Sequence, residues 1–337
     1  MHAAVLYGPQ DLRLTQFPEP PMDDNAVKIA VAYCGLCGTD FHKFSGRPGA
    51  RPVTYPVPLG HEVSGIVAEV GKNVTSFKPG DRVTVDPNHS CGRCHFCRSG
   101  KSHLCQNSRG VVKGMAQFVC PPQDNVYHLP DSLDLRTAAL TEPLSCCLRG
   151  MDQLDLHLGQ TVAIIGMGAI GQMMLQLCHK ASAGSIIVIE PVEEKRQLAM
   201  ELGATLFINP NKEDVTATIR NAGIVCVDRV LECVGLPQTA AMALEVADHG
   251  ATVVLFGVAD RDAVLPLKLY EAFLKELTVK TSYINPHTTQ RAIDLLAAGA
   301  IKTQGLIQDL SMDQLPPEME TRALSRLGKV IVSIPQD

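Results

Sequence analysis

Residues 161–177 read Thr-Val-Ala-Ile-Ile-Gly-Met-Gly-Ala-Ile-Gly-Gln-Met-Met-Leu-Gln-Leu, and this stretch decides the fold. The run from Val162 to Ile165 is apolar and rich in β-branched residues, which is typical of a strand buried on both faces. Three glycines follow in G-x-G-x-x-G spacing, and a helix-prone segment comes next. A strand, a glycine turn and a helix in this order predict a dinucleotide site, because backbone can approach a pyrophosphate at the turn and the helix N-terminus supplies positive potential.

The predicted cofactor contacts continue beyond the turn. A second strand ends at Glu190, 19 residues after Gly171, close to the offset of about 20 residues at which a carboxylate binds the adenosine ribose. This carboxylate would repel a 2′-phosphate and so favours NAD over NADP, whereas the nearby Lys195 and Arg196 weaken that preference. The alternative is a glycine turn without a ligand, which the combination of strand, turn, helix and acid disfavours. The residues assigned to the cofactor are Gly166, Gly168, Ala169, Ile170, Gly171, Glu190 and Arg196.

Composition limits the classes of function. The chain of 337 residues is long enough for two domains. A net charge of −5 and the lack of a basic run argue against a nucleic-acid partner or an anionic membrane surface. The first residues lack the charged segment and cleavage site of a signal peptide. Twelve cysteines without an export signal favour free thiols and metal ligands over disulfides, and we expect a cytoplasmic protein.

The pattern of secondary structure changes along the chain. Residues 1–145 hold short strand-like runs between turns rich in proline and glycine, which predicts an all-β domain. From about residue 148 strands and helices alternate, which predicts a doubly wound parallel sheet. The six strands expected in this sheet are 162–165, 186–190, 205–208, 227–231, 252–256 and 278–282. A last strand at 329–334 has no obvious place among them, so we expect the chain to return to the first domain.

Four cysteines form a compact motif of their own. Cys91, Cys94, Cys97 and Cys105 follow C-x2-C-x2-C-x7-C, with glycines and polar residues between them. Four thiolates on a short loop make a closed tetrahedral zinc site with no open position, so this site should be structural. An iron–sulfur cluster is the alternative, but the final spacing does not match ferredoxin runs.

A second set of metal-ligating residues is dispersed along the first domain. It comprises the run Cys34-Gly-Leu-Cys-Gly-Thr-Asp-Phe-His42, then Gly60-His-Glu62, then Thr141-Glu-Pro-Leu144. Each of these is weak evidence alone. Together they offer a thiolate, an imidazole and carboxylates, which is the donor mixture of a catalytic zinc with an open position.

With these motifs the chain resembles the zinc-dependent medium-chain dehydrogenase/reductase family along essentially its whole length. The Glu-Pro-Leu-Ser run at 142–145 resembles the polyol branch, the sorbitol dehydrogenase-like enzymes. The resemblance implies a GroES-like β catalytic domain formed by residues 1–147 and 288–337. It also implies a Rossmann-type dinucleotide-binding domain at residues 148–287, with zinc and nicotinamide held in a cleft between the domains.

The resemblance also implies individual roles. Cys37, His61 and Glu62 would be ligands of the catalytic zinc, and Glu142 would ligate it directly or through its water. Thr39 would pass on the proton of the alcohol, and His42 would be the outer member of this relay. Asp40 would orient a ligand imidazole from the second layer.

The implied reaction is NAD-dependent oxidation of a secondary hydroxyl of a polyol, sugar or cyclitol to the ketone, by a homodimer or homotetramer. Two departures from the branch bear on the substrate. The run Leu306–Ser311 lacks a basic residue that the branch usually carries, and Gln117 stands where glutamate is common. An L-threonine or short-diol dehydrogenase is therefore an alternative, and a non-catalytic NAD- or zinc-binding sensor is an alternative of another class.

Overall fold

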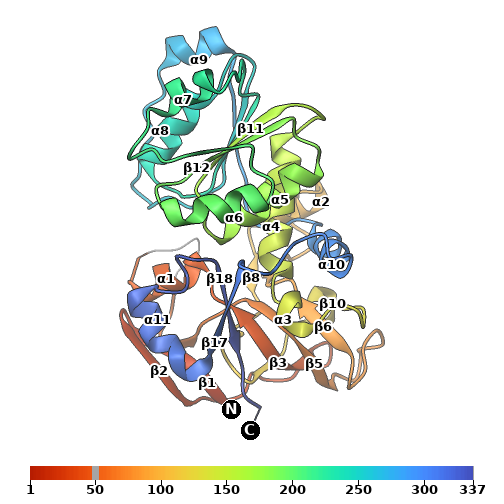
Figure 1. The fold of residues 1–337 in the computed structure, drawn as a ribbon. Helices are drawn as coiled ribbons and strands as arrows, with labels where there is room; N and C mark the ends of the chain where they lie inside the picture. The colour runs from red at the N-terminus through yellow and green to blue at the C-terminus, as the bar shows by residue number, and fades with distance from the viewer. Residues whose placement is uncertain (48–52, 337) are drawn as a thin grey trace. The chain divides into compact units, whose positions relative to one another are not determined.

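The computed structural model describes residues 1–47 and 53–336. Its contacts divide the chain into two compact units (Figure 1). The first unit comprises Met1–Ser145 and Asn285–Asp337, and the second comprises Cys146–Ile284. These bounds lie two to three residues away from those expected from the sequence.

The second unit is built on a six-stranded sheet whose neighbouring strands are all parallel. In spatial order its strands are β13 (Leu206–Ile208), β12 (Ser185–Ile189), β11 (Thr161–Ile165), β14 (Arg229–Glu232), β15 (Thr252–Leu255) and β16 (Thr278–Thr281). The prediction of a doubly wound parallel sheet is confirmed. After β13 the chain crosses back past β11 to form β14, so the switch in strand order lies between β11 and β14.

Helices cover both faces of this sheet (Figure 1). The connections between its strands are α5 (Ala169–Lys180), α6 (Arg196–Glu201), α7 (Val215–Asn221) and α8 (Pro237–Val246). Their apolar sides pack on a core of small and β-branched residues from the strands, as the unbroken apolar runs predict. One further helix, α9 (Leu269–Lys275), was not predicted from the sequence. It carries its apolar residues outward rather than toward the core.

The first unit contains two larger sheets. A seven-stranded sheet has the order β10 (Val126–His128), β6 (Arg82–Val85), β5 (Glu62–Val70), β3 (Val27–Gly35), β18 (Lys329–Ser333) and β17 (Ile307–Ser311), and β9 (Phe118–Val119) also pairs with β3. A three-stranded sheet joins β2 (Asp11–Gln16), β1 (His2–Gly8) and β4 (Val57–Pro58). The last strand, β18, therefore pairs with the first domain's β3, as we expect from the sequence.

The prediction that residues 1–145 are all β was wrong in one respect, because short helices interrupt the strands. The helices of this part are α1 (Gly38–Phe44), α2 (His95–Arg98), α3 (Leu135–Ala138) and the start of α4 (Thr141–Leu154), and the tail adds α10 (Thr289–Ala297) and α11 (Leu315–Thr321). Helices of four to seven residues show too few turns for a helical period to stand out in the sequence. Within residues 1–47 and 53–336, no helix has both the length and the apolar character needed to cross a bilayer.

Candidate metal and cofactor sites

The four cysteines of the first motif converge on one point. The sulfur atoms of Cys91, Cys94, Cys97 and Cys105 all lie within 4.8 Å of one another. The Sγ of Cys94 lies 3.5 Å from that of Cys97 and 3.9 Å from that of Cys105. A tetrahedral zinc with Zn–S bonds of about 2.3 Å separates its sulfurs by roughly 3.8 Å. The spacing therefore fits zinc without rearrangement of the loop.

Backbone groups of this loop favour the thiolate form that a metal requires. The N–H groups of Cys91 and Asn107 each lie 3.3 Å from the Sγ of Cys105. Hydrogen bonds from the N–H groups of Arg93 and Cys94 lower the pKa of Cys91 to about 6. The loop thus stabilises negative sulfur at Cys91 and Cys94, as a structural zinc requires, whereas burial and the neighbouring thiols raise the pKa of Cys97 to about 11.

The dispersed residues also come together, because neighbouring strands carry them. Strands β3 and β5 pair antiparallel, with Gly35 opposite Glu62. Cys37 follows β3 and immediately precedes α1, whereas His61 immediately precedes β5. One ligand atom from each of Cys37, His61 and Glu62 lies within 4.8 Å of the other two.

A buried carboxylate ties the two ligand-bearing segments to each other. Asp40 is fully buried, and its Oδ2 accepts a hydrogen bond from the Cys37 N–H at 3.1 Å. Its Oδ1 accepts one from the Gly60 N–H, also at 3.1 Å. The resemblance implies that Asp40 orients a ligand imidazole. In the structure its two oxygens hold the backbone next to Cys37 and His61.

The two oxygens of Glu62 have different surroundings. Oε1 lies 2.5 Å from the Nζ of Lys329, which also donates to the Leu36 carbonyl at 3.0 Å. Oε2 is buried and, in the described part of the chain, has no hydrogen-bond partner. Gly35 leaves room for this oxygen, since a Cβ there would come within 1.9 Å of it. A buried carboxylate oxygen without a partner beside a thiol and an imidazole fits a metal ligand.

Negative charge accumulates around His61. Burial alone would lower the pKa of His61, but Cys37, Asp40 and Glu142 outweigh it and raise that pKa to about 10. Glu142 lies in the first turn of α4 and is 8% exposed. Burial, reinforced by Glu62, raises its pKa to about 7. This excess of anionic groups is what a divalent cation would compensate, so the donor set fits zinc.

The structure does not gather all the expected ligands equally closely. Among the described residues, Glu142 is not a member of the group whose ligand atoms lie within 4.8 Å of one another. Thr39 and His42 both lie on α1, three residues apart, so their side chains project from neighbouring positions of the helix surface. The His42 carbonyl accepts hydrogen bonds from the Ser45 hydroxyl and the Arg47 N–H.

The glycine turn of the second unit has the shape predicted for it. Gly166 follows β11 with a φ of +94°. A Cβ on Gly171 would come within 1.9 Å of the Gly166 carbonyl oxygen, so only glycine lets α5 pack this close. A Cβ on Gly168 would meet nothing within 4 Å. Open space in front of Gly168 and the first turn of α5, where Ala169 and Ile170 lie, suits a pyrophosphate.

Two other predicted cofactor residues already have partners within the second unit. Glu190 is 5% exposed, and its Oε2 accepts from the Met167 N–H in the glycine turn at 2.6 Å. Its Oε1 accepts from the Val192 N–H at 3.1 Å. Arg196 pairs with the Glu193 carboxylate and donates to the Phe207 carbonyl at 2.9 Å. Glu190 thus holds the glycine turn in place. The guanidinium of Arg196 is already bound to Glu193 and to the Phe207 carbonyl.

Lys329 is the residue of this site that sequence reasoning missed. It is separated from Glu62 by 267 residues, so no local spacing links the two. The available signal was a lone cation at the start of the otherwise apolar run Lys329-Val-Ile-Val.

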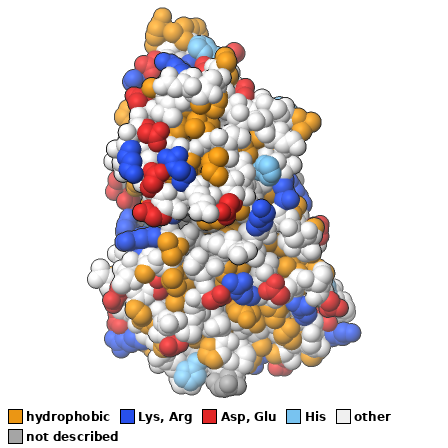
Figure 2. Space-filling model, in the orientation of Figure 1, with side chains coloured by type: hydrophobic (Ala, Val, Ile, Leu, Met, Phe, Trp, Pro, Cys, Tyr) orange, Lys and Arg blue, Asp and Glu red, His pale blue; other side chains and the backbone are white. Residues whose placement is uncertain are grey.

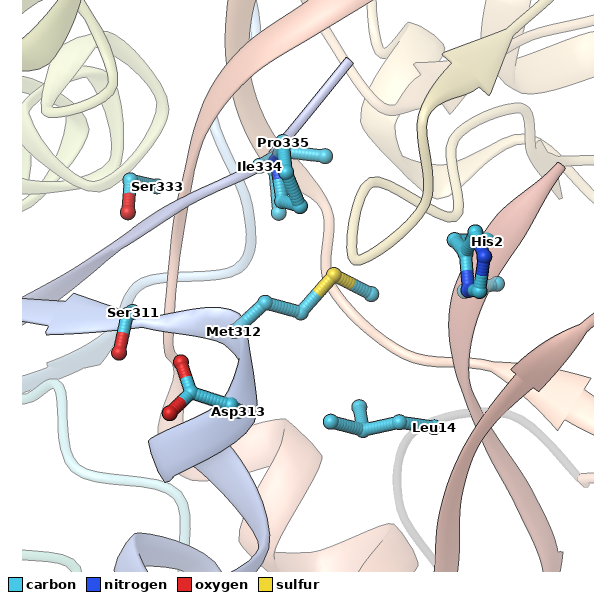
Figure 3. Close-up of a pocket in the computed structure, with 9 residues that line it drawn as sticks. His2, Leu14, Ser311, Met312, Asp313, Ser333, Ile334 and Pro335 are labelled. Atoms are coloured by element: carbon cyan, nitrogen blue, oxygen red, sulfur yellow. The ribbon is translucent and has the colours of Figure 1, made fainter. Parts of the chain in front are cut away.

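A cavity of about 370 Å³ lies elsewhere in the first unit, near both ends of the chain. Figure 3 shows Met312 reaching into it between Leu14, Ile334 and Asp313. None of the predicted ligand residues lines it.

Known proteins resemble the chain over nearly all of its length. Residues 23–131 match the alcohol dehydrogenase GroES-like domain, and residues 169–298 match the zinc-binding dehydrogenase domain. Sorbitol dehydrogenase of Bacillus subtilis is 32% identical over 332 residues, covering 96% of this chain and 94% of the relative. L-threonine 3-dehydrogenase of Caldanaerobacter subterraneus is 30% identical over 333 residues, covering 93% and 92%.

Solved structures agree with these matches. A zinc-binding dehydrogenase from Sinorhizobium meliloti, bound to NADP, is 37% identical. It superimposes with a TM-score of 0.91, and the match covers 99% of both chains.

Proposed function

The chain belongs to the zinc-dependent medium-chain dehydrogenase family, and from this membership we propose that it oxidises a secondary hydroxyl of a polyol, sugar or cyclitol to the ketone with NAD. In this proposal Cys37, His61 and Glu62 hold the catalytic zinc, and Cys91, Cys94, Cys97 and Cys105 hold a structural zinc. The catalytic ion would supply Lewis acidity toward the substrate hydroxyl. The observation that carries the proposal is the convergence of the Cys37 thiol, the His61 imidazole and the Glu62 carboxylate within 4.8 Å, where one buried oxygen of Glu62 has no hydrogen-bond partner among the described residues.

Residues of α1 would carry the proton away. Oxidation of an alcohol releases one proton from the hydroxyl in addition to the hydride, and the site needs a path for it. Thr39 can accept and donate through one hydroxyl, and His42 lies three residues further along the same helix. We assign Thr39 to the inner and His42 to the outer position of this path.

Glu142 would act beside the three closest donors. It is buried, and without a metal ion burial raises its pKa to about 7. Its position outside the group of three favours contact with the metal through a water over permanent direct ligation.

Glu190 supports a preference for NAD. It lies at the carboxyl end of β12, where the adenosine ribose of a dinucleotide is expected. Its buried carboxylate is held by the N–H groups of Met167 and Val192, and a 2′-phosphate would come close to its negative charge. The ammonium of Lys195, 3.8 Å from Oε1, offsets part of this repulsion. Comparison of kcat/KM for NAD and NADP tests the preference, and a ratio near one would contradict it.

We also propose that the protein self-associates through the outer face of the second unit. Leu269, Tyr270 and Phe273 on α9 are each more than 70% exposed. Hydrophobic side chains gather at the end of the second unit where α9 lies (Figure 2). Strand β16 beside them is the edge of its sheet, with one side of its backbone open. An apolar face next to an open strand edge favours a second copy of the same chain. Light scattering should give at least a dimer, and Phe273→Glu should shift it toward monomer; a wild-type monomer at micromolar concentration would refute this interface.

Metal analysis and a substrate screen test the central proposal together. We expect about two zinc ions per chain and NADH formation with at least one member of a panel of polyols, sugar phosphates, cyclitols, short diols and L-threonine. Turnover confined to L-threonine or a diol would favour the alternative dehydrogenase. Zinc and dinucleotide binding without any turnover would favour a sensor. None of the twelve cysteines forms a disulfide in the structure, which supports a reducing compartment such as the cytoplasm.

A further inference from the structure

A buried glutamate at the end of β14 has no assigned role. Glu232 is 1% exposed, and its Oε1 accepts three hydrogen bonds. The donors are the N–H groups of Val234 and Gly235, both at 2.8 Å, and the hydroxyl of Thr239 at 2.7 Å. Hydrogen bonds to a charged acceptor are stronger than neutral ones, so this oxygen fixes residues 233–236 against the end of the strand.

The backbone of Glu232 fixes a second loop. Its carbonyl accepts from the N–H groups of Phe256 and Gly257, both at 2.9 Å, which follow β15. A Cβ on Gly257 would lie 2.1 Å from the Gly235 nitrogen, and one on Gly235 would lie 2.6 Å from the Val258 oxygen. The loops after β14 and β15 therefore pack backbone against backbone.

The same packing reaches the glycine turn after β11. A Cβ on Gly166 would lie 2.6 Å from a methyl carbon of Val234. Glu232 itself is opposite Ile165, the last residue of β11, in the parallel pairing. The three loops at the carboxyl ends of β11, β14 and β15 thus pack closely against one another, with Glu232 at the centre of the cluster.

These three loops lie where the strand order of the sheet reverses. In an open α/β sheet a dinucleotide binds outside the carboxyl ends of the strands at such a switch point, here between β11 and β14. In the proposed function the glycine turn would bind the pyrophosphate, and Glu190 on the β12 side would bind the adenosine half. The nicotinamide half would then lie against the loops after β14 and β15. These loops expose the aliphatic side chains of Val234 (42%) and Val258 (69%), which suit the face of an aromatic ring.

We propose that Glu232 is a positioning residue for the nicotinamide half of the cofactor. It does not touch the reacting atoms; it holds Val234, Gly235 and, through its carbonyl, the loop of Val258 in the arrangement that orients the ring. This inference rests on the proposed dehydrogenase function. Hydride transfer is sensitive to placement, and an error of about 1 Å can cost roughly a hundredfold in rate.

Three glutamine variants of the zinc-loaded enzyme test the assignment. Glu232→Gln keeps the side-chain volume but offers the three donors a neutral oxygen. Glu190→Gln changes the acid on the other side of β11. Glu245→Gln changes an exposed acid of α8 and is the control. The measurements are kcat, the Kd of ADP-ribose, and the stereospecificity of deuterium transfer from the nicotinamide C4.

We expect Glu232→Gln to lower kcat by about 10- to 100-fold and to reduce stereospecificity, with the Kd of ADP-ribose within about twofold of wild type. Glu190→Gln should show the opposite pattern, a weaker ADP-ribose complex with stereospecificity retained. Thr239→Val removes one of the three donors and should shift kcat in the same direction as Glu232→Gln, by a smaller factor.

Several results would overturn the inference. Unchanged kcat and stereospecificity in Glu232→Gln would show that the ring is oriented by other groups. A parallel loss of ADP-ribose affinity, kcat and thermal stability would show a general structural role instead. Wild-type protein that binds zinc but no NADH would refute the proposed function itself, which separates that failure from failure of the role of Glu232.

Discussion

Replacement of Lys329 by methionine should destabilise the metal-free protein strongly and the zinc-loaded protein much less. Lys329 and Glu62 form an ion pair at 2.5 Å, and their side chains are only 5% and 1% exposed. Burial disfavours the ammonium, but Glu62 and Cys37 outweigh it and raise the pKa of Lys329 above its ordinary value. The Lys329 ammonium therefore stays charged at neutral pH. Methionine has a similar length but leaves the Glu62 carboxylate without its cation.

The magnitude follows from the burial of the pair. Removing one partner of a buried ion pair costs about 3 to 5 kcal/mol, because the other charge remains buried and uncompensated. Zinc at the Cys37 and His61 donors would supply positive charge to the same carboxylate. If zinc restores about 2 kcal/mol, thermodynamic linkage requires that the variant binds this zinc about 30-fold more tightly, since about 1.4 kcal/mol is a factor of ten.

Urea denaturation of wild type and Lys329→Met, with and without zinc, measures the two differences under matched conditions. Competition with a chromophoric chelator measures the affinity of the catalytic zinc directly. Lys329→Arg retains a cation and serves as the control, with a loss of stability well below that of the methionine variant. Weaker zinc binding in Lys329→Met would refute the reasoning, because it would mean that Lys329 holds Glu62 in place for the metal rather than competing with it for charge.

Three further predictions concern the metal sites. Cys37→Ala should reduce the zinc content from about two ions to about one per chain and abolish turnover; loss of NADH binding as well, measured by fluorescence titration, would contradict the division of roles between the units. Cys94→Ser should also release one zinc, but should leave that of Cys37 in place, so a variant that loses both by metal analysis would count against separate sites. Because burial raises the pKa of Glu142 to about 7, the unfolded chain gives up this proton before the folded one does. The metal-free protein should therefore lose stability between about pH 4.5 and pH 7, by up to about 3 kcal/mol. Glu142→Gln should abolish that loss, and an unchanged pH profile from urea denaturation would disprove it.

Local patterns in the sequence predicted most of the fold of the second unit. The first four strands along the chain are each followed by a predicted helical segment, so this alternation of strand and helix was enough to predict the doubly wound sheet. The glycine spacing after β11 was equally informative, because the contact between Gly171 and the Gly166 carbonyl leaves no room for a side chain. Helix α9 was not predicted because its apolar residues point outward, so its sequence lacks the amphipathic pattern of a helix packed on a core.

The sequence predicted which residues could ligate a metal, but not how they are arranged in space. Cys37 and the pair His61–Glu62 stand out in the sequence, yet their closeness depends on the register that places Gly35 opposite Glu62. The hydrogen bond from the Gly60 N–H to Asp40 could not be predicted either, since 20 residues separate the two. Short-range patterns carry no information on such pairings.

The return of the chain to the first unit also brings the Lys329 side chain to the candidate metal site. Strand β18 pairs with β3, the strand that leads into Cys37, and its first residue delivers an ammonium to Glu62. The charge of one carboxylate oxygen is thereby balanced by Lys329, and the other oxygen has no partner among residues 1–47 and 53–336. A single glutamate can then serve as a metal ligand without carrying its full negative charge into the site. The last strand of the chain thus moderates the negative charge of the proposed metal centre at Cys37, His61 and Glu62, in addition to completing the sheet.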